Sequence, residues 1–413
     1  MNNTAKIKKL ISQEVRRQQD GLVMIASENY ASSDVLSAMG SPLSNKYSEG
    51  YPHKRYYTGN EAIDEIEDLA IDLALKIFKL SKNKWHANVQ PHSGSSANLA
   101  VYLGLLKPGD KILAMDLAQG GHLTHGSPVN FSGQLFNFVH YGVSSKTEKL
   151  DYKKILAIAK AEKPKLIVCG ATAYPRSIDF KKFGAIAKSV GALMMADISH
   201  IAGLVVAGVH SSPFPYADIV TSTTHKTLGG PRSAFIISRI ELAKEIDRAV
   251  FPGLQGGPLE NMIAAKAICF DFAMSQKFKA IQKQTIKNTK ILADIFEKNK
   301  IRVVSGGTDN HLLLLDLRAL NISGKESANV LAGAKIYTNA NMIPNDTGTP
   351  LNPSGLRLGT PALSRRGMKE KQMKLIGKWI VDILKNPTDK KLIQKISLKV
   401  TKLTKQFPVY KNL

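Results

Sequence analysis

Between residues 60 and 240, helical and extended patterns of apolar residues alternate along the chain. Within residues 61–80 the apolar positions fall on one face of a helix: Ile63, Ile66, Ala70, Leu73 and Ile77. The runs between helical stretches are short and several are apolar throughout, as in strands covered on both faces. These predicted strands span 87–90, 111–115, 134–140, 165–170, 192–197, 218–223 and 234–238. The alternation predicts an α/β domain with a largely parallel sheet.

After this region the pattern becomes mainly helical. A helical stretch over about 258–299 leads into a part with fewer strands, and residues 385–406 place Leu392, Ile396, Val400 and Leu403 at helical spacing among lysines. We therefore predict three parts: an N-terminal helical arm (1–24), a large α/β domain (25–276) and a small C-terminal α+β domain (277–413).

The charge of the chain adds a second class of function to consider. Its net charge is +24, which is compatible with a nucleic-acid or anionic-membrane partner. Only twelve of the 57 basic residues are arginine, whereas phosphate readers favour the bidentate arginine fork. A solvated lysine-rich surface is the favoured interpretation, and a lysine-rich RNA-binding protein stays as an alternative.

Neither a membrane span nor a metal site is expected. No window reaches the ~18 apolar residues of a membrane span, and the N-terminus has no signal-peptide core, so a cytoplasmic protein is expected. Cys169 and Cys269 form no CxxC pair or Cys/His cluster, so neither zinc nor a disulfide is predicted.

In an open parallel sheet, ligands bind beyond the carboxyl ends of the strands. After residues 87–90, Ser93, Gly94 and Ser95 precede a helix; they could cap the helix or hold a phosphate. After residues 111–115, a glycine-containing loop carries His122, which is either incidental or stacked on a planar ring.

Two oppositely charged residues follow later strands. Asp197 closes one strand, where it either caps the next segment or meets a cation. Lys226 follows another strand directly after His225; it is a loop lysine or, if desolvated, a nucleophile that forms a Schiff base. A phosphate site, a stacking imidazole, an acid and this lysine together match pyridoxal phosphate, which has a phosphate, a flat ring, a pyridine nitrogen and an aldehyde.

Several longer motifs point to one family. They include "IASENYAS", "NKYSEGYPHKRYYTG", "NVQPHSGSSAN", "GGHLTHGSPVNFSG", "DISHIAGLVVAG", "TSTTHKTLGGPR", "FPGLQGGP", "SGGTDNHL" and "SGLRLGTPA". With these motifs, from about residue 20 to 370, the chain resembles the serine hydroxymethyltransferases. The resemblance implies the fold type I architecture of aspartate aminotransferase, a cytoplasmic location and pyridoxal 5'-phosphate bound covalently to Lys226. It also implies reversible transfer of the serine hydroxymethyl carbon to tetrahydrofolate, through an aldimine and a quinonoid, giving glycine and 5,10-methylenetetrahydrofolate.

The resemblance also implies roles for individual residues. The implied catalytic residues are Lys226, Glu49, His225, Asp197, His122, Tyr57 and Thr223. The implied cofactor contacts are Lys226, Ser93, Gly94, Ser95, His122, Thr172, Asp197, His200, Tyr47, Gly257 and Arg232. Serine would meet Ser27, Arg357, Tyr57 and Glu49, and folate would meet Leu117, Gly121, His122, Leu123, Asn341, Thr349, Pro350 and Leu351. A homodimer with shared sites is implied, with Tyr47, Glu49, Tyr57 and Gly257 of the partner subunit completing each site.

A few positions depart from the family pattern. Gln119 stands where many members have histidine, Thr172 replaces serine, and Leu254 replaces glycine. Residues 349–351 differ from the more common Ser-Pro-Phe. None of these changes removes a catalytic group. The nearest alternative activity is that of a folate-independent pyridoxal-phosphate aldolase acting on β-hydroxy amino acids.

Overall fold

The computed structural model describes residues 2–410, and the chain divides into two compact units. Ala31–Lys283 form the large unit, whereas Met1–Tyr30 and Gln284–Leu413 together form the small unit. Each unit has its own sheet and its own buried apolar cluster. The residues before Ala31 therefore belong to the same unit as the C-terminal third of the chain.

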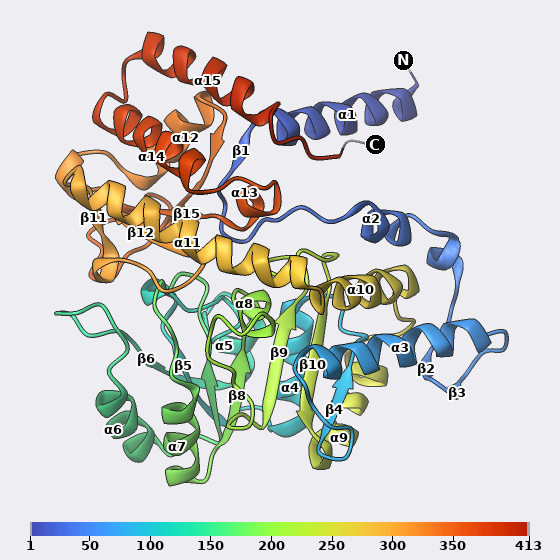
Figure 1. Cartoon of the computed structure of the whole chain (residues 1–413). Helices are drawn as coiled ribbons and strands as arrows, with labels where there is room; N and C mark the ends of the chain where they lie inside the picture. The colour runs from blue at the N-terminus through green and yellow to red at the C-terminus, as the bar shows by residue number, and fades with distance from the viewer. Residues whose placement is uncertain (1, 411–413) are drawn as a thin grey trace. The chain divides into compact units, whose positions relative to one another are not determined.

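The large unit is built on a seven-stranded sheet with the order β4-β10-β9-β8-β7-β5-β6 (Figure 1). Its strands are β4 (Trp85–Asn88), β5 (Lys111–Met115), β6 (Asn137–Tyr141), β7 (Leu166–Cys169), β8 (Leu193–Asp197), β9 (Ile219–Thr223) and β10 (Ala234–Arg239). Strand β10 is antiparallel to both of its neighbours, β4 and β9, and the other six strands of the sheet run in one direction. The predicted fold class is confirmed, and each of the seven strands overlaps one of the predicted apolar runs.

Helices connect these strands and cover the sheet (Figure 1). They are α2 (Ser33–Met39), α3 (Glu61–Ile77), α4 (Gly94–Leu105), α5 (Phe131–Leu135), α6 (Tyr152–Glu162), α7 (Phe180–Val190), α8 (Ala202–Val206), α9 (Ala243–Arg248) and α10 (Glu260–Ala273). A small hairpin of β2 (Gly50–Tyr51) and β3 (Lys54–Arg55) lies between α2 and α3 in the sequence. Central strands such as β7 and β9 are buried along their whole length, as their continuous apolar pattern predicts.

The single helical stretch predicted over 258–299 is wrong, because the structure breaks it in two. The first helix, α10, ends at Ala273, and α11 (Gln276–Lys298) begins after Ser275. The Ser275 hydroxyl accepts a hydrogen bond of 3.1 Å from the Phe278 amide, which is the geometry of a helix N-cap. The apolar pattern continues through the break, so only the serine signals it.

The small unit contains a four-stranded antiparallel sheet with the order β11-β12-β15-β14. Its strands are β11 (Arg302–Val303), β12 (Leu312–Asp316), β14 (Asn339–Asn341) and β15 (Gly355–Gly359), and β1 (Leu22–Val23) pairs in parallel with β13 (Ile336–Tyr337). Its helices are α1 (Asn3–Asp20), most of α11, α12 (Gly324–Gly333), α13 (Pro361–Arg365), α14 (Glu370–Lys385) and α15 (Lys390–Thr404).

The basic C-terminal helix predicted from the sequence is confirmed as α15. It buries Ile396, Val400 and Leu403 in the core of the small unit, with Leu392 packed at the edge of that core. The lysines between them lie on the other faces, as expected for an amphipathic helix. Among residues 2–410, no helix is both long and apolar enough to cross a membrane.

Candidate active site

The central strands of the large unit end at one edge of the sheet, and several of the predicted cofactor contacts lie there. Strand β8 ends at Asp197, and its parallel neighbour β9 ends at Thr223, three residues before Lys226. The loop after β5 brings His122 to the same edge. Because parallel strands present their carboxyl ends together, side chains far apart in sequence become neighbours here.

The Asp197 side chain is 10% exposed, and three donors hold its carboxylate. Its Oδ2 accepts a 3.0 Å hydrogen bond from Asn98 Nδ2 and lies 3.3 Å from His125 Nε2. Its Oδ1 accepts a hydrogen bond of 3.1 Å from the Ser199 amide. Burial alone would raise the pKa of Asp197, but the two histidines and Asn98 outweigh burial and hold this pKa well below its usual range. The site therefore contains a fixed negative charge.

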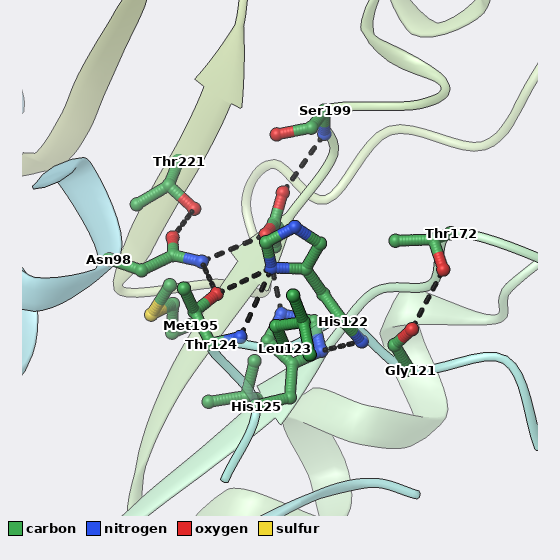
Figure 2. Close-up of polar contacts among 12 residues, drawn as sticks. Asn98, Gly121, His122, Leu123, Thr124, His125, Thr172, Met195, Ser199 and Thr221 are labelled. Atoms are coloured by element: carbon green, nitrogen blue, oxygen red, sulfur yellow. Dashed lines mark hydrogen bonds and ion pairs between the residues drawn. The ribbon is translucent and has the colours of Figure 1, made fainter. Parts of the chain in front are cut away.

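His122 supplies a neutral aromatic ring at this edge. Burial, His125 and Lys226 together lower the pKa of His122 to about 4, although Asp197 opposes them. The Nδ1 atom of His122 lies 2.7 Å from Thr124 Oγ1, a hydroxyl that also accepts a hydrogen bond from Asn98 (Figure 2).

The Lys226 amine is positioned by the end of β9. Its Nζ donates a hydrogen bond of 3.1 Å to Thr223 Oγ1. The preceding residue, His225, has its pKa lowered to about 3, first by burial and then by Lys226 and Arg232. His225 is therefore a neutral imidazole near pH 7.

The N-terminus of α4 lies against the same strand end. Ser93 caps this helix through a reciprocal capping box with Ser96, so the N-cap interpretation of Ser93 is confirmed. A Cβ atom added to Gly94 would come within 2.8 Å of Thr223 Cγ2, so only glycine fits between the helix and β9. The first turn of α4 is thus next to Thr223, the residue that binds Lys226.

Two other predicted cofactor contacts, Thr172 and His200, make hydrogen bonds with other residues of the large unit. Thr172 Oγ1 donates a 2.7 Å hydrogen bond to the Gly121 carbonyl and so supports the loop that carries His122 (Figure 2). His200 is buried, and its carbonyl accepts a 2.9 Å hydrogen bond from Thr227 Oγ1. The family more often has serine at this position. Threonine keeps the hydroxyl group of serine, and this hydroxyl is hydrogen-bonded to the backbone.

A second group of predicted residues lies together on the surface of the large unit. Tyr47 Oη donates a hydrogen bond of 3.3 Å to Glu49 Oε1, and the rings of Tyr47 and Tyr57 meet edge to face at 5.2 Å. A Cβ atom on Gly257 would lie 3.3 Å from the Tyr47 ring. Tyr47 and Tyr57 are 54% and 49% exposed. We call these four residues, Tyr47, Glu49, Tyr57 and Gly257, the tyrosine patch.

The remaining predicted substrate contacts belong to the small unit and are described by themselves. Arg357 occupies the middle of β15, where its Nε donates a 3.1 Å hydrogen bond to Asn339 Oδ1. Burial lowers the pKa of Arg357 to about 10, so it remains a cation near neutral pH. Ser27 follows β1 in a half-buried position, and Asn341 ends β14.

The predicted folate contacts include unusually exposed apolar side chains. Leu117 and Leu123 of the large unit and Leu351 of the small unit are all exposed, and Thr349 and Pro350 also face solvent. Isolated exposed leucines are common, but two of them flanking the Gly121–His122 segment fit the edge of an apolar ring.

Sequence reasoning did not select Asn98 and His125, which hold Asp197. His125 stands three residues after His122, and Asn98 lies in the first turns of α4. Their positions in the sequence do not identify them as partners of Asp197, because Asp197 is 72 residues from His125 and 99 residues from Asn98. The departure at Gln119 also has a structural explanation: its Oε1 accepts a 2.8 Å hydrogen bond from the Val143 amide.

These groups fit pyridoxal 5'-phosphate in both charge and position. The structure offers a lysine amine, an ionised carboxylate, a neutral imidazole and a helix N-terminus around one sheet edge. Such a site on a sheet in which only one of seven strands is reversed defines a pyridoxal-phosphate-dependent enzyme of fold type I.

Comparison with known proteins narrows this class to one family. The family model described as "Serine hydroxymethyltransferase" matches residues 1–380. A serine hydroxymethyltransferase of Methanosarcina barkeri is 57% identical over 401 residues, which is 97% of this chain and 96% of that protein. Proteins of the same name from a Nostoc species and Desulforapulum autotrophicum are 52% and 53% identical, over 100% and 98% of this chain and 96% and 95% of theirs. The chain belongs to the serine hydroxymethyltransferase family.

The activity follows from family membership. The enzyme transfers the hydroxymethyl carbon of serine reversibly to tetrahydrofolate, with pyridoxal 5'-phosphate as its cofactor. Its products are glycine and 5,10-methylenetetrahydrofolate. These relatives support neither of the two alternative functions, a folate-independent aldolase or an RNA-binding protein.

Proposed function

We propose that the strand-end residues of the large unit form the cofactor half of each active site, and that a second copy of the chain supplies the tyrosine patch. The observation that carries the proposal is the position of Lys226 and Asp197. Asp197 ends β8, Lys226 follows the end of the adjacent parallel strand β9, and the Asp197 carboxylate lies 3.3 Å from His125, in the loop that also carries His122. This arrangement supports a site in which one flat ring meets an amine, a carboxylate and an imidazole.

In this proposal each side chain holds one part of the cofactor. Lys226 holds the aldehyde carbon, and Asp197 keeps a proton on the pyridine nitrogen. His122 lies against the ring, which requires a neutral imidazole and agrees with the lowered pKa of that residue. The N-terminus of α4, at Ser93, Gly94 and Ser95, binds the phosphate. When bound, the cofactor accepts the electrons released as a bond to the serine Cα breaks.

Arg357 binds the carboxylate of serine. Its guanidinium is buried yet charged, which supports a bidentate contact with a substrate anion. Its Nε is oriented by Asn339, so the Nη groups are presented in a fixed plane. Ser27 contributes at the same end of the substrate.

Glu49 moves protons to and from the serine side-chain hydroxyl, and Tyr47 orients its carboxyl group. The 3.3 Å hydrogen bond from Tyr47 Oη to Glu49 Oε1 supports this pairing. Half-exposed aromatic rings beside a glycine-rich segment also suit an interface with a second copy of the chain. In the homodimer, the patch of each chain faces the cofactor of the other.

Folate binds beside the loop that carries His122. The exposed side chains of Leu117 and Leu123 provide apolar surface for the pterin ring. Gly121 lets the loop between them pack against the carbonyls of Met115 and Asp116, where a Cβ atom would clash. The small unit contributes Asn341 and residues 349–351, where the departure from Ser-Pro-Phe leaves Leu351 as the apolar group.

The experiment compares glycine formation from serine with and without tetrahydrofolate, using the purified holoenzyme. We expect rapid glycine formation only when tetrahydrofolate is present, together with stoichiometric 5,10-methylenetetrahydrofolate. Glycine formation at the same rate without folate would contradict the proposal and favour the aldolase alternative.

A further inference from the structure

A long connection joins two paired strands of the small unit. Strands β14 and β15 are antiparallel neighbours, and Asn341 lies opposite Gly355 at the end of their pairing. Residues 342–354 connect the two strands and include 349–351, the proposed folate contacts. A much shorter turn can join such strands, so the extra length calls for an explanation. We call residues 342–354 the β14–β15 loop.

The base of the β14–β15 loop is fixed to the small unit, whereas its tip is exposed. Ile343 is 1% exposed and Pro353 is buried. The Pro353 carbonyl accepts a 2.8 Å hydrogen bond from the amide of Gly324, the first residue of α12. Residues 349–352 face solvent, and Leu351 is 85% exposed. The loop therefore presents an apolar side chain on an anchored base.

The Asp346 carboxylate binds both sides of this loop. Its Oδ2 accepts hydrogen bonds of 3.1 Å from the Ile343 amide and from the Ser354 amide. Its Oδ1 accepts a hydrogen bond of 2.7 Å from the Gly348 amide and lies 3.3 Å from the Ser354 amide nitrogen. One side chain therefore joins the start of the loop, the segment before the tip and the end of the loop.

The contact between Asp346 and the loop backbone is close. A Cβ atom on Gly348 would come within 3.2 Å of Asp346 Oδ1 and within 2.6 Å of the Asn352 carbonyl oxygen, so glycine suits this position. Burial alone would raise the pKa of Asp346, but the hydrogen bonds from Ser354, Gly348 and Ile343 outweigh burial and lower this pKa. Asp346 is therefore an ionised carboxylate near neutral pH, and both of its oxygens accept.

A second anchor holds the residue before Asp346. Asn345 has a positive φ of 55°, a conformation that asparagine adopts more readily than most residues. Its carbonyl accepts a 3.1 Å hydrogen bond from Arg318 Nη1. Arg318 Nη2 lies 2.8 Å from Oδ2 of Asp316, the last residue of β12. The backbone turn that carries Asp346 is therefore tied to the sheet of the small unit.

We propose that Asp346 is a positioning residue for folate binding: its carboxylate holds the β14–β15 loop closed, so that Thr349, Pro350 and Leu351 are in place before folate arrives. This inference rests on the folate contacts proposed above and deepens them by naming what orders them. A loop that is ordered in advance loses little conformational freedom on binding, which strengthens affinity. Asp346 itself contacts neither folate nor serine in this account.

The test measures the Kd of tetrahydrofolate for the holoenzyme in the presence of glycine, together with kcat and the KM of each substrate for transfer. The variant is Asp346→Ala, and Asp389→Ala is the matched control. Asp389 also belongs to the small unit, and its carboxylate caps α15 by accepting a 2.9 Å hydrogen bond from the Leu392 amide. Both substitutions remove an aspartate that binds the backbone, but only Asp346 lies in the β14–β15 loop.

We expect Asp346→Ala to raise the Kd and KM of tetrahydrofolate by roughly 10-fold, because the loop must then become ordered on binding. The KM for serine, kcat at saturating folate and the folate-independent exchange of the glycine α-hydrogen should change by less than about twofold. Hydrogen exchange followed by mass spectrometry should show faster exchange of backbone amides in residues 343–354. Asp389→Ala should bind tetrahydrofolate as wild type does.

A conservative variant separates the shape of the side chain from its acceptors. Asp346→Asn keeps one acceptor oxygen but replaces the other with an amide group that cannot accept a hydrogen bond. We expect its rise in Kd to be smaller than that of Asp346→Ala. It replaces Asp346→Ala in every comparison if the alanine variant does not fold.

A variant of the loop tip tests whether Asp346 acts through the proposed folate contacts. The tip variant combines Thr349→Gly, Pro350→Gly and Leu351→Gly, and it is made with and without Asp346→Ala. We expect the tip variant to raise the Kd of tetrahydrofolate. Adding Asp346→Ala should then have little further effect, because both changes act through the same contacts.

The outcomes distinguish failure of the inference from failure of the proposed contacts. If the tip variant weakens folate binding but Asp346→Ala has the Kd of Asp389→Ala, the contacts stand and Asp346 has no positioning role. Additive losses, or a rise in the KM for serine as large as that for folate, would also overturn the inference. If the tip variant binds tetrahydrofolate normally, the proposed contacts fail, and the inference fails with them.

Discussion

At the scale of single residues, the surroundings of Asp197 explain why a carboxylate can close a buried strand. Asn98, His125 and the Ser199 amide bind its oxygens, and the lowered pKa of Asp197 keeps it ionised near neutral pH. The carboxylate stays charged without any help from a ligand. A pyridine nitrogen that approaches it is therefore favoured in its protonated form.

His122 should make the cofactor-free protein sensitive to acid. In the unfolded chain this histidine takes up a proton near pH 6.5, whereas in the folded protein it does so only near pH 4. The stability contributed by the neutral, buried imidazole is thus complete above pH 6.5 and is lost as the pH falls toward 4. Between pH 7 and pH 5 the loss from this one residue should be about 2 kcal/mol.

Urea denaturation of cofactor-free wild type and His122→Phe at both pH values measures this effect. Phenylalanine keeps an aromatic ring at the position but cannot take up a proton. We expect the variant to lose clearly less stability on acidification than wild type. Equal losses in the two proteins would mean that His122 is not held neutral by burial.

At the scale of elements, the close contact between α4 and β9 creates the proposed phosphate site. Gly94 is the first residue of α4, and the Thr223 side chain fills the space where its Cβ would be. In the proposed site, this contact brings the first turn of α4 close to the cofactor that Lys226 would hold. The fit between the two elements, rather than one side chain, builds this part of the site.

Gly94→Ala should therefore weaken cofactor binding. The added methyl group must push α4 and β9 apart, at a cost of about 1–3 kcal/mol, which corresponds to a rise in cofactor Kd of roughly 5- to 150-fold. Gly40→Ala is a matched control, because a Cβ there meets nothing closer than 3.6 Å and the backbone φ is −91°. Cofactor titration of the apoprotein measures both, and unchanged affinity in Gly94→Ala would contradict this role.

The same elements show what the sequence could predict. The strands β7 and β9 were predicted from continuous apolar runs, and Asp197 and Lys226 from their positions at strand ends. The break between α10 and α11 could not be predicted from periodicity, since the apolar pattern continues across Ser275. Helix α3 was predicted as amphipathic, but the burial of Asp64 and Glu67 on its apolar face depends on Arg55 and was not.

The burial of Lys266 also could not be predicted from the sequence. In the sequence it lies within an apolar helix, "ENMIAAKAICFDFA", where a lysine normally extends toward solvent. Its partners are the carbonyls of Val89, which follows β4, and Ala234, the first residue of β10; they lie 177 and 32 positions away in the sequence. No local pattern specifies those partners, so a buried lysine of this kind becomes visible only in the folded structure.

At the scale of the whole molecule, the proposed active site requires two chains. Lys226 and Glu49 are assigned to the same reaction, but in the proposed homodimer they come from different subunits at each site. Each subunit would then be inactive alone, and its active site would be completed by its partner. This arrangement makes a prediction about mixtures of inactive variants.

Lys226→Ala and Glu49→Gln subunits should each be nearly inactive alone and should regain activity when unfolded, mixed and refolded together. Random pairing gives mixed dimers in half of the population, and one of the two sites in each has both native groups, so about a quarter of wild-type activity should return. Size-exclusion chromatography checks that the refolded protein is dimeric. A mixture as inactive as its parents would mean that Lys226 and Glu49 serve the same site from one chain.

The most direct test of the central claim is chemical identification of the lysine that carries the cofactor. The wild-type holoenzyme is treated with borohydride, which converts a Schiff base into a stable amine, and the peptides are mapped by mass spectrometry. We predict one pyridoxyl group per chain on Lys226 and none on the buried Lys266. A pyridoxyl group on any other lysine, or a Lys226→Ala protein labelled to the same extent, would contradict the account.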